Sequence, residues 1–471
     1  MPTIKKKALI IGAGTGGYPC AIRLGQLGVD AMVVEKAQPG GVCLNWGCIP
    51  SKALISATKL AHKAQHAEHM GVSFGPPTVD MPKMQGWKAG IVKKLTGGVK
   101  QLIKGAGTQY VTATAEILGP GRVKLTYPDG QPEDIVECEH LVIATGSLPI
   151  HIPGFEIDQK RIVDSTGALD LDHVPEHMVC IGGGIIGLEL GQTFQRLGTK
   201  LTVLEGMDRV LGPCDKDTAA LVAKRIKKDG GEIVTNAMAK GWSERDGKMW
   251  VRAEVGGETK EYPADVVLVA VGRRPVSKGF GLDKLGVEVD ARGFIKVDAR
   301  QQTNVAGVYA VGDVCGQPML AHKASHEGEV LAEVIAGHNA INDARTIPNV
   351  VFTEPEIASA GLGEDEAKQA GYEIEIGKFP FAASGRAMAI DETDGFVKVI
   401  IDKRDNRVLG IHVVGPEASD LISEGALAIE MGAFAEDISL TVHPHPTLGE
   451  AVMEAAKHAL GEAIHIGNRR R

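Results

Sequence analysis

A glycine-rich turn that occurs twice in the same setting most constrains the fold of this chain of 471 residues. In the first copy, the aliphatic run 8–11 leads into the turn 12–17; a helical stretch and a second aliphatic run follow and end at an acidic residue. The second copy lies 170 positions later, since 12 corresponds to 182 and 35 to 205. The paired residues are Gly12 and Gly182, Gly14 and Gly184, Gly17 and Gly187, and Glu35 and Glu205.

Each copy matches the turn with which a βαβ unit binds a dinucleotide. The first glycine allows a tight turn, the second lets a pyrophosphate approach the backbone, and the third lets the helix pack on the strand. The helix N-terminus attracts phosphates, and the acidic residue accepts hydrogen bonds from ribose hydroxyls. Two such turns can also serve ordinary strand–helix packing. Recurrence of the whole pattern in one register instead favours two Rossmann-like α/β units and two dinucleotides.

The acidic residue of the second copy indicates which nicotinamide dinucleotide binds there. The carboxylate of Glu205 suits a free ribose 2′-hydroxyl and repels a 2′-phosphate. Arg209 lies four residues further on and would soften that preference, but no pair of arginines stands at the strand end. The sequence therefore favours NAD over NADP.

The composition is that of a globular chain, and its length is roughly three times that of a ~150-residue domain. Lys and Arg number 51 against 59 Asp and Glu, so the net charge of −8 disfavours a nucleic-acid partner. No apolar run approaches the ~18 residues of a membrane span. Lys5 to Lys7 resemble the start of a signal peptide, but glycines interrupt the apolar run that follows. We therefore expect a buried first strand, no membrane association and a cytoplasmic location, or the mitochondrial matrix for a processed eukaryotic form.

Two of the seven cysteines, Cys43 and Cys48, form a C-x₄-C pair. A loop this short stabilises little through chain entropy, so a disulfide across it can open and close without unfolding. Two buried thiols or half of a metal site are the alternatives, but no companion cysteine pair or histidine cluster supports zinc, and we predict no metal. The scattered remainder are expected to be small core residues: Cys20, Cys138, Cys180, Cys214 and Cys315.

The segment from Gly40 to Lys52 resembles the active-site signature of the flavin-dependent pyridine nucleotide-disulfide oxidoreductases, above all the branch that oxidises dihydrolipoamide. Trp46 replaces the usual valine there, and Thr15 replaces a common proline in the first glycine turn. Four further segments resemble family motifs in the family's order: 144–147, 271–275, 307–313 and 319–324.

The resemblance implies FAD and NAD as cofactors and assigns residues to each. For FAD these are Gly12, Gly14, Gly17, Glu35, Lys52, Thr145, Gly146, Ser147, Asp313 and Ala321. For NAD they are Gly182, Gly184, Gly187, Glu205, Gly272 and Arg273. Lys52 and Glu189 could be ordinary surface charges, but the family pairs them beside the flavin, where a cation stabilises negative charge on the reduced ring.

Near the C-terminus, two histidines alternate with prolines ahead of a helix predicted to begin near Thr447. The prolines hold the loop rigid, and Thr447 and Glu450 have the spacing of a capping box, so Glu450 also has a structural explanation. The family motif places the general base at His445, oriented by Glu450, rather than at His443. It also implies that this histidine enters the site of a partner subunit, and hence a homodimer.

The resemblance predicts that dihydrolipoamide attacks a Cys43–Cys48 disulfide at Cys43 with help from His445, and that Cys48 passes electrons through FAD to NAD. The substrates would be the lipoyl arms of 2-oxoacid dehydrogenase complexes or of the glycine cleavage system. Glutathione and trypanothione reductases usually carry basic residues for NADP, a mercuric reductase needs a further C-terminal cysteine pair, and a soluble transhydrogenase lacks the redox pair. A structural component of a large complex is the non-enzymatic alternative, which the intact base motif disfavours.

The motif order predicts two Rossmann-like dinucleotide-binding domains and a C-terminal α+β dimerisation domain. We expect an FAD-binding domain over 1–148 and an NAD-binding domain over 149–275. A central segment over 276–347 would complete the FAD domain, and an interface domain would span 348–471.

Overall fold

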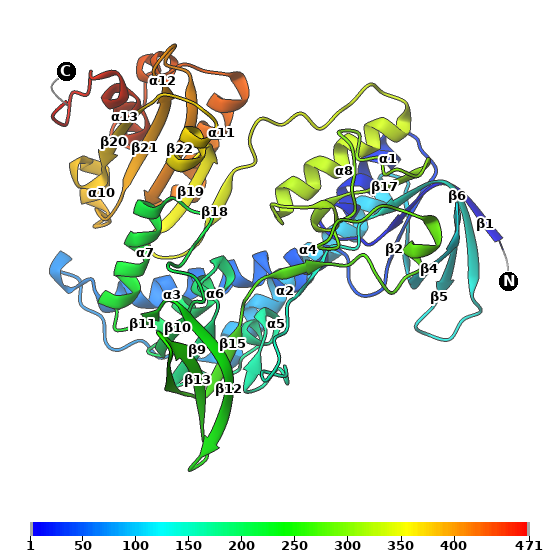
Figure 1. Cartoon of the computed structure of the whole chain (residues 1–471), viewed down its shortest axis with the longest axis horizontal. Coiled ribbons are helices and arrows are strands. Elements are labelled where there is room, and N and C mark those ends of the chain that lie inside the picture. The colour runs from blue at the N-terminus through cyan, green and yellow to red at the C-terminus, as the bar shows by residue number, and fades with distance from the viewer. Residues whose placement is uncertain (1–2, 469–471) are drawn as a thin grey trace.

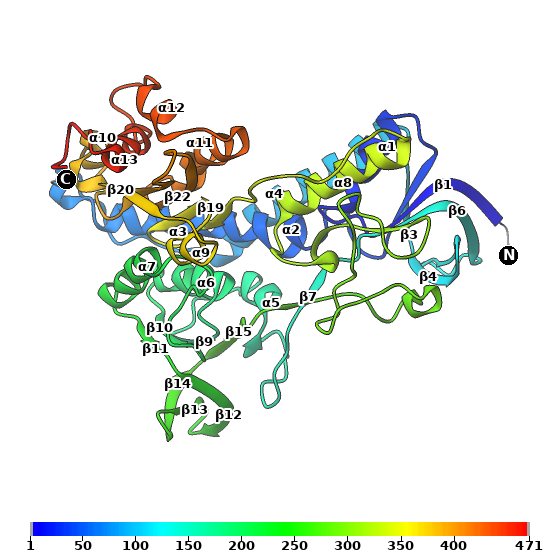
Figure 2. The ribbon, with the colours of Figure 1, turned by 45° about the horizontal axis from the view of Figure 1, so that its top comes forward.

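The computed structural model describes residues 3–468 and arranges them around three main sheets (Figures 1 and 2). The first sheet lies near the N-terminus and has the strand order β3-β2-β1-β6-β5-β4, with β17 also paired to β6. The pairings of β1 with β2 and β6, and of β2 with β3, are parallel, as expected for the first repeat. The strands are β1 (Thr3–Ile11), β2 (Ala31–Glu35), β3 (Gln109–Thr112), β4 (Thr114–Gly119), β5 (Arg122–Thr126), β6 (Asp134–Ile143) and β17 (Val308–Ala310).

The second repeat forms a parallel sheet of the same kind, with the order β11-β10-β9-β15-β8. Its strands are β8 (Ile162–Val163), β9 (His177–Ile181), β10 (Lys200–Leu204), β11 (Glu232–Val234) and β15 (Val266–Val269). A separate antiparallel sheet projects beyond it and consists of β12 (Ala237–Arg245), β13 (Lys248–Val255) and β14 (Glu258–Ala264). The aliphatic residues of β9 and β10 are almost wholly buried because helices cover a sheet made of parallel strands.

The chain passes between these two sheets at a pair of short antiparallel strands, β7 (Ser147–Pro149) and β16 (Arg273–Pro275). After β16 it returns to the first sheet, where Val308 to Ala310 pair with the end of β6. The predicted boundaries at 148 and 275 fall within these crossing strands, and the domain limits themselves stay predictions.

The C-terminal part is a five-stranded antiparallel sheet with the order β18-β19-β22-β21-β20. Its strands are β18 (Asn349–Val351), β19 (Glu356–Gly361), β20 (Ile374–Pro380), β21 (Phe396–Asp402) and β22 (Val408–Gly415). Apolar side chains from this sheet and its helices form one core, which includes Val397, Val413, Ile422 and Val452. The predicted fold class, two Rossmann-like domains with a C-terminal α+β domain, is confirmed.

The helices join these units. In both views α3 passes between the C-terminal sheet and the second sheet, and it contacts α6 (Figures 1 and 2). The α-helices are α1 (Gly17–Gln26), α2 (Gly41–Trp46), α3 (Cys48–Gln65), α4 (Met81–Gly105), α5 (Ser165–Leu169), α6 (Ile185–Gln195), α7 (Lys216–Lys228), α8 (Ala321–Ala336), α9 (Glu364–Gln369), α10 (Gly385–Ala389), α11 (Ala418–Met431), α12 (Ala435–Leu440) and α13 (Glu450–Leu460). No helix among the described residues has the length and apolarity needed to cross a membrane.

One expectation about local structure needs correction. The last helix begins at Glu450, not near Thr447; the side chain of Glu450 accepts the backbone N–H of Thr447 at 2.9 Å, but residues 447–449 precede the helix. The expected buried first strand is confirmed over the apolar run Ala8 to Ile11, while residues 3–7 of the same strand alternate between exposed and half-buried.

The C-terminal core depends on a glycine at which strand and helix touch. A Cβ on Gly377 of β20 would lie 1.8 Å from the carbonyl oxygen of Ala455 in α13. We expect Gly377→Ala to destabilise the protein by about 1–3 kcal/mol, because the backbones must separate to admit the methyl group. A lower midpoint of thermal unfolding would measure this. Gly90→Ala in α4, where a Cβ meets nothing within 4 Å, is the control and should not lower the midpoint. An equal midpoint for both variants would contradict the prediction.

Candidate active site

The two glycine turns share one hydrogen-bond pattern at the predicted offset. The N–H of Gly12 donates to Val34 at 2.8 Å, and that of Gly182 donates to Leu204 at 2.9 Å. In the first turn Glu35 accepts the N–H groups of Ala13 and Ala37, at 2.8 and 2.9 Å. In the second turn Glu205 accepts those of Gly183 and Met207, each at 2.7 Å. The sequence repeat is therefore also a repeat of backbone geometry.

The third glycine of each turn lies where a side chain cannot fit. A Cβ on Gly17 would be 1.9 Å from the carbonyl oxygen of Gly12, and a Cβ on Gly187 would be 2.3 Å from that of Gly182. Gly12 and Gly182 themselves have φ of 103° and 105°, a left-handed region that favours glycine. These contacts hold each helix against its strand, as the dinucleotide-binding turn requires.

Both turns open into a single cavity of about 2230 Å³. Single-ligand pockets span roughly 300–1,000 Å³, so this volume has room for two dinucleotides. Most of the predicted cofactor residues line it: Gly12, Gly14, Glu35, Lys52, Thr145, Gly146, Ser147, Asp313 and Ala321 for FAD, and Gly182, Gly184, Glu205, Gly272 and Arg273 for NAD. The exceptions are Gly17 and Gly187, whose part is to pack helix on strand. The bare glycine turns and flanking carboxylates are those that a dinucleotide needs, so the residues present fit FAD and NAD.

Polar contacts join the segments at the flavin end of the cavity. The hydroxyl of Ser147 donates to Asp313 at 2.5 Å and accepts from the guanidinium of Arg273 at 2.8 Å. Arg273 also donates to the carbonyl of Ser147, so its side chain points to the segment 144–147, which was assigned to FAD. The predicted contact of Arg273 with NAD stays a prediction. The structure adds Glu327 of α8, a buried residue that accepts the N–H of Gly312 at 2.7 Å and pairs with Lys323. The i,i+4 spacing of Lys323 and Glu327 is the sequence feature that could have indicated this ion pair.

The redox pair lies beside the first turn because two glycines allow close approach. A Cβ on Gly41 would lie 2.6 Å from the Cα of Gly14, so the loop that carries Cys43 packs directly on the first glycine turn. Gly47 separates α2 from α3, and α3 begins at Cys48. Both cysteines are thiols in the structure and line the cavity, with Cys43 half-buried and Cys48 exposed to the cavity.

The two thiols have opposite electrostatic settings. The hydrogen bond from Cys43 lowers the pKa of Cys48; burial opposes this, and the charge of Lys52 lowers the pKa further. The same hydrogen bond and burial raise the pKa of Cys43 well above its usual value. In the reduced pair the negative charge therefore resides on Cys48.

The five remaining cysteines have the core character that was expected. Cys20, Cys180 and Cys214 are buried, while Cys138 and Cys315 are partly buried. Burial raises the pKa of Cys20, Cys138 and Cys180 to about 12, which keeps these thiols protonated and unreactive.

Lys52 and Glu189 are brought together by α3 and α6. The ammonium of Lys52 lies 2.7 Å from Glu189, which is almost fully buried. Glu189 also accepts the N–H of Phe352 at 2.9 Å, and the Lys52 ammonium lies 4.3 Å from the centre of the Phe352 ring. Phe352 had not been predicted, because it joins the site from 300 residues further along the chain.

The predicted base pair is formed, but it lies away from the cysteines of its own chain. The Nδ1 atom of His445 is 2.9 Å from Glu450, and the histidine side chain is 80% exposed. Partial burial raises the pKa of Glu450, but the N–H of Thr447 and the imidazole of His445 outweigh it and lower that pKa overall. His443 is held by Glu424 at 2.8 Å and is 7% exposed, which suits a structural residue. Neither His445 nor Glu450 lines the cavity.

Comparison with known families decides the assignment. The family model described as pyridine nucleotide-disulphide oxidoreductase matches residues 6–328, and the model for the dimerisation domain of the same family matches residues 347–456. The chain belongs to the pyridine nucleotide-disulphide oxidoreductase family.

Curated members of this family resemble the chain over its whole length. The dihydrolipoyl dehydrogenases of Geobacillus stearothermophilus and Bacillus subtilis are each 50% identical to it, with 98% of both chains covered. The dihydrolipoyl dehydrogenase of Haloferax volcanii is 49% identical over the same shares. Among solved structures, LpdA from Mycobacterium tuberculosis superposes with a TM-score of 0.88 at 26% identity, covering 96% of this chain and 99% of that one. The flavoprotein disulfide reductase RclA from Escherichia coli, in its Cu(II) complex, gives 0.86 at 25% identity, covering 96% and 99%.

The charge of Lys52 should govern the reactivity of Cys48 in this member of the oxidoreductase family. We expect Lys52→Met to raise the pKa of the Cys48 thiol, since it removes a nearby cation that lowers this pKa. The pH dependence of alkylation of the reduced protein by iodoacetamide measures this. Lys59→Met alters the same helix, but Lys59 pairs with Glu356 at 2.9 Å, so this variant should keep the wild-type profile. The prediction is wrong if the two variants have the same profile.

Proposed function

We propose that this chain oxidises dihydrolipoamide to lipoamide and reduces NAD to NADH, the activity of a dihydrolipoamide dehydrogenase. The observation that carries the proposal is the Cys43–Cys48 pair on the wall of one cavity that also contains both dinucleotide turns. Near 50% identity to curated dihydrolipoyl dehydrogenases over 98% of the chain supports the substrate.

The chain's own residues account for thiol chemistry at the pair. A substrate thiolate attacks the sulfur of Cys43 in the disulfide, and Cys48 leaves as a thiolate that the charge of Lys52 stabilises. The second substrate thiolate then displaces Cys43, so that lipoamide leaves with a new disulfide and both cysteines are reduced. FAD bound at the first turn supplies two-electron transfer from this dithiol to the nicotinamide.

Glu450 determines which nitrogen of His445 acts as the base. A carboxylate with a lowered pKa is an acceptor only, so the Nδ1 of His445 must donate to it. The Nε2 atom is then free to take the proton that the substrate thiol loses, and the imidazolium formed is stabilised by Glu450.

The preference for NAD rests on Glu205 and on where Arg209 points. The guanidinium of Arg209 donates to the carbonyls of Gly212 and Cys214, at 2.5 and 2.8 Å. It is therefore occupied within its own loop and is not available to a ribose 2′-phosphate. The carboxylate of Glu205 keeps lone pairs for ribose hydroxyls beyond the two backbone N–H groups that it accepts.

A homodimer would complete the site. Around α11, α12 and the segment that leads to His443, apolar side chains are strongly exposed in the single chain: Leu427 at 61%, Met431 at 76%, Leu440 at 80% and Val442 at 92%. A surface of this kind is typical of a subunit interface. In the homodimer, a second copy of the chain would cover these side chains. The exposed His445 of each chain would then reach the cysteines of the other chain.

The partners follow from the substrate. We propose that the homodimer serves the lipoyl arms of 2-oxoacid dehydrogenase complexes or of the glycine cleavage system, in the cytoplasm. The bacterial and archaeal origin of the named relatives supports that location.

The activity is tested by supplying thiol and nucleotide in separate combinations. We expect the flavin-loaded protein to reduce NAD with dihydrolipoamide, and to do so much more slowly with NADP, because of Glu205. Reduced glutathione and reduced trypanothione should give no comparable rate. The absence of NAD reduction with dihydrolipoamide, in protein that still oxidises NADH with an artificial dye, would refute the substrate.

Exchange of His445 between subunits is tested with hybrid dimers of Cys48→Ser and His445→Gln chains. In the hybrid, one site combines intact cysteines with an intact partner histidine, and the other site lacks both. We expect each variant homodimer to lose thiol-driven turnover, and the purified hybrid to recover about half of the wild-type rate, one site in two. If His445 acted within its own chain, neither hybrid site would be complete, and an inactive hybrid would contradict the proposal.

A further inference from the structure

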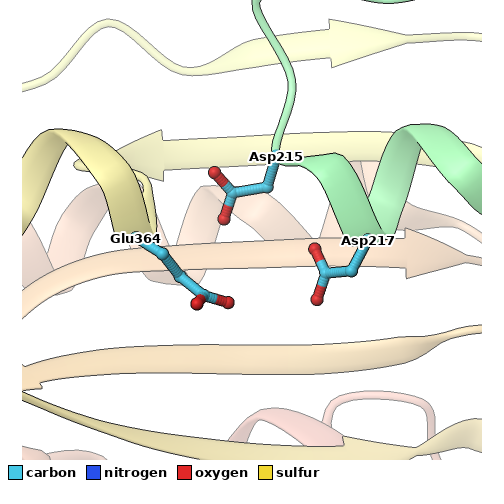
Figure 3. Close-up of side chains that lie close together, drawn as sticks. All are labelled: Asp215, Asp217 and Glu364. Atoms are coloured by element: carbon cyan, nitrogen blue, oxygen red, sulfur yellow. The ribbon is translucent and has the colours of Figure 1, made fainter. Parts of the chain in front are cut away.

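Three carboxylates converge where the second domain meets the C-terminal sheet. Asp215 and Asp217 stand at the start of α7 and Glu364 is the first residue of α9, and Figure 3 shows all three turned toward a common space. Their oxygens lie within 4.8 Å of one another, a spacing that would also suit a cation.

An ammonium group occupies that space. The Nζ of Lys398, in β21, lies 2.7 Å from Asp215, 2.9 Å from Asp217 and 2.7 Å from Glu364. The side chain of Lys398 is only 1% exposed, and its three N–H donors match the three carboxylates. We call these four residues the Lys398 cluster; it needs no metal ion.

Neighbouring elements complete the environment of the cluster. Lys378 of β20 lies 2.9 Å from Asp217. His412 of β22 has its Nδ1 atom 3.9 Å from Asp215, while its Nε2 donates to the carbonyl of Leu362 at 3.0 Å. Gly363 lets α9 approach, since a Cβ there would be 2.4 Å from the Asp215 carboxylate. Charged or polar groups from α7, α9, β20 and β22 therefore surround the ammonium group of Lys398.

Within the cluster, Asp215 is directly joined to a loop that borders the second glycine turn. It follows the loop 206–214, which begins next to Glu205. Within that loop, the N–H of Leu211 donates to the carbonyl of Gly183 at 2.9 Å, and Val210 packs where a Cβ of Gly183 would lie. Gly183 belongs to the second glycine turn, and its N–H is held by Glu205. The loop is thus held at Val210 and Leu211 by the turn and, through Asp215 at its C-terminal end, by Lys398.

We propose that Lys398 of the C-terminal domain is a positioning residue for the NAD site, acting through Asp215 on the loop 206–214. This inference rests on the proposed function, because it assigns NAD to the second turn. Residues such as Met207 and Pro213 of this loop line the cavity, so a loop released from Lys398 would lose its fixed position against the nucleotide. The C-terminal domain therefore supports nucleotide binding as well as dimerisation.

The test compares two substitutions, each at a carboxylate partner of Lys398, that differ in their connection to the loop. Asp215→Asn and Glu364→Gln each remove one carboxylate charge around Lys398. We expect Asp215→Asn to weaken NAD binding to the flavin-loaded homodimer about three- to tenfold, measured by calorimetry. The reason is that the loop 206–214 loses the ion pair of Asp215 with Lys398 that fixes its C-terminal end. Glu364→Gln should change NAD affinity less than about twofold, and neither variant should change the KM for dihydrolipoamide by more than that.

Lys398→Met removes the shared cation and should weaken NAD binding at least as much as Asp215→Asn, with a lower midpoint of unfolding. If this variant does not fold, the Asp215→Asn and Glu364→Gln pair decides the question alone. Equal NAD affinities for that pair, or wild-type affinity for Asp215→Asn, would overturn the inference. A wild-type protein that binds no NAD would instead refute the proposed function, so the two failures are distinguishable.

Discussion

Backbone contact at glycine is the constraint on which the active site depends. Because Gly17 has no side chain, the start of α1 can rest against the carbonyl of Gly12, and the same contact recurs between Gly187 and Gly182. The turn that results is closed by a carboxylate from the next strand, Glu35 or Glu205. Gly41 then packs on Gly14, and this contact places the redox loop at the first turn. The reacting sulfurs are therefore positioned by backbone packing before any side chain of the site contributes.

Local features of this site could be predicted from the sequence, and long-range ones could not. The glycine turns and their acidic residues keep a fixed register, so a chain read alone locates them to the residue. The pairing of Lys52 with Glu189 came only from family resemblance, because the two residues are 137 positions apart. Phe352 and Glu327 were missed, since nothing near Phe352 indicates its contact with Lys52, and the i,i+4 spacing of Lys323 and Glu327 does not indicate the contact of Glu327 with Gly312. The start of α13 was misplaced because Thr447 and Glu450 have capping-box spacing, but their contact forms in a turn that precedes the helix.

Lys398 is a residue whose partners could not be predicted from the sequence, although the sequence indicates that it must have partners. It lies in the strand Phe396–Asp402, whose seven residues are all buried, and a lysine is almost never fully buried unless it is paired. The sequence thus signals that Lys398 has partners but not which ones, since Asp215 and Asp217 come from a different domain 181 or more positions away. The same limit applies to His445, which is 80% exposed and which, in the proposed homodimer, would act in the site of the other subunit.

Two ion pairs that each contain a buried charged residue, Glu189 with Lys52 and Lys398 with Asp215, lie at junctions between domains, and this placement has a physical consequence. A buried ion pair adds little net stability, because the desolvation cost offsets the attraction, but a buried charge that loses its partner costs about 3–5 kcal/mol. Lys52 joins α3 to Glu189 of the second domain, and Lys398 joins the C-terminal sheet to α7. A small rotation of the second domain would leave the buried Glu189 and Lys398 without these partners, so the pairs select one domain orientation more than they stabilise the fold. FAD and NAD held by the two glycine turns would need that orientation, because electron transfer between them would require both to reach the same part of the shared cavity.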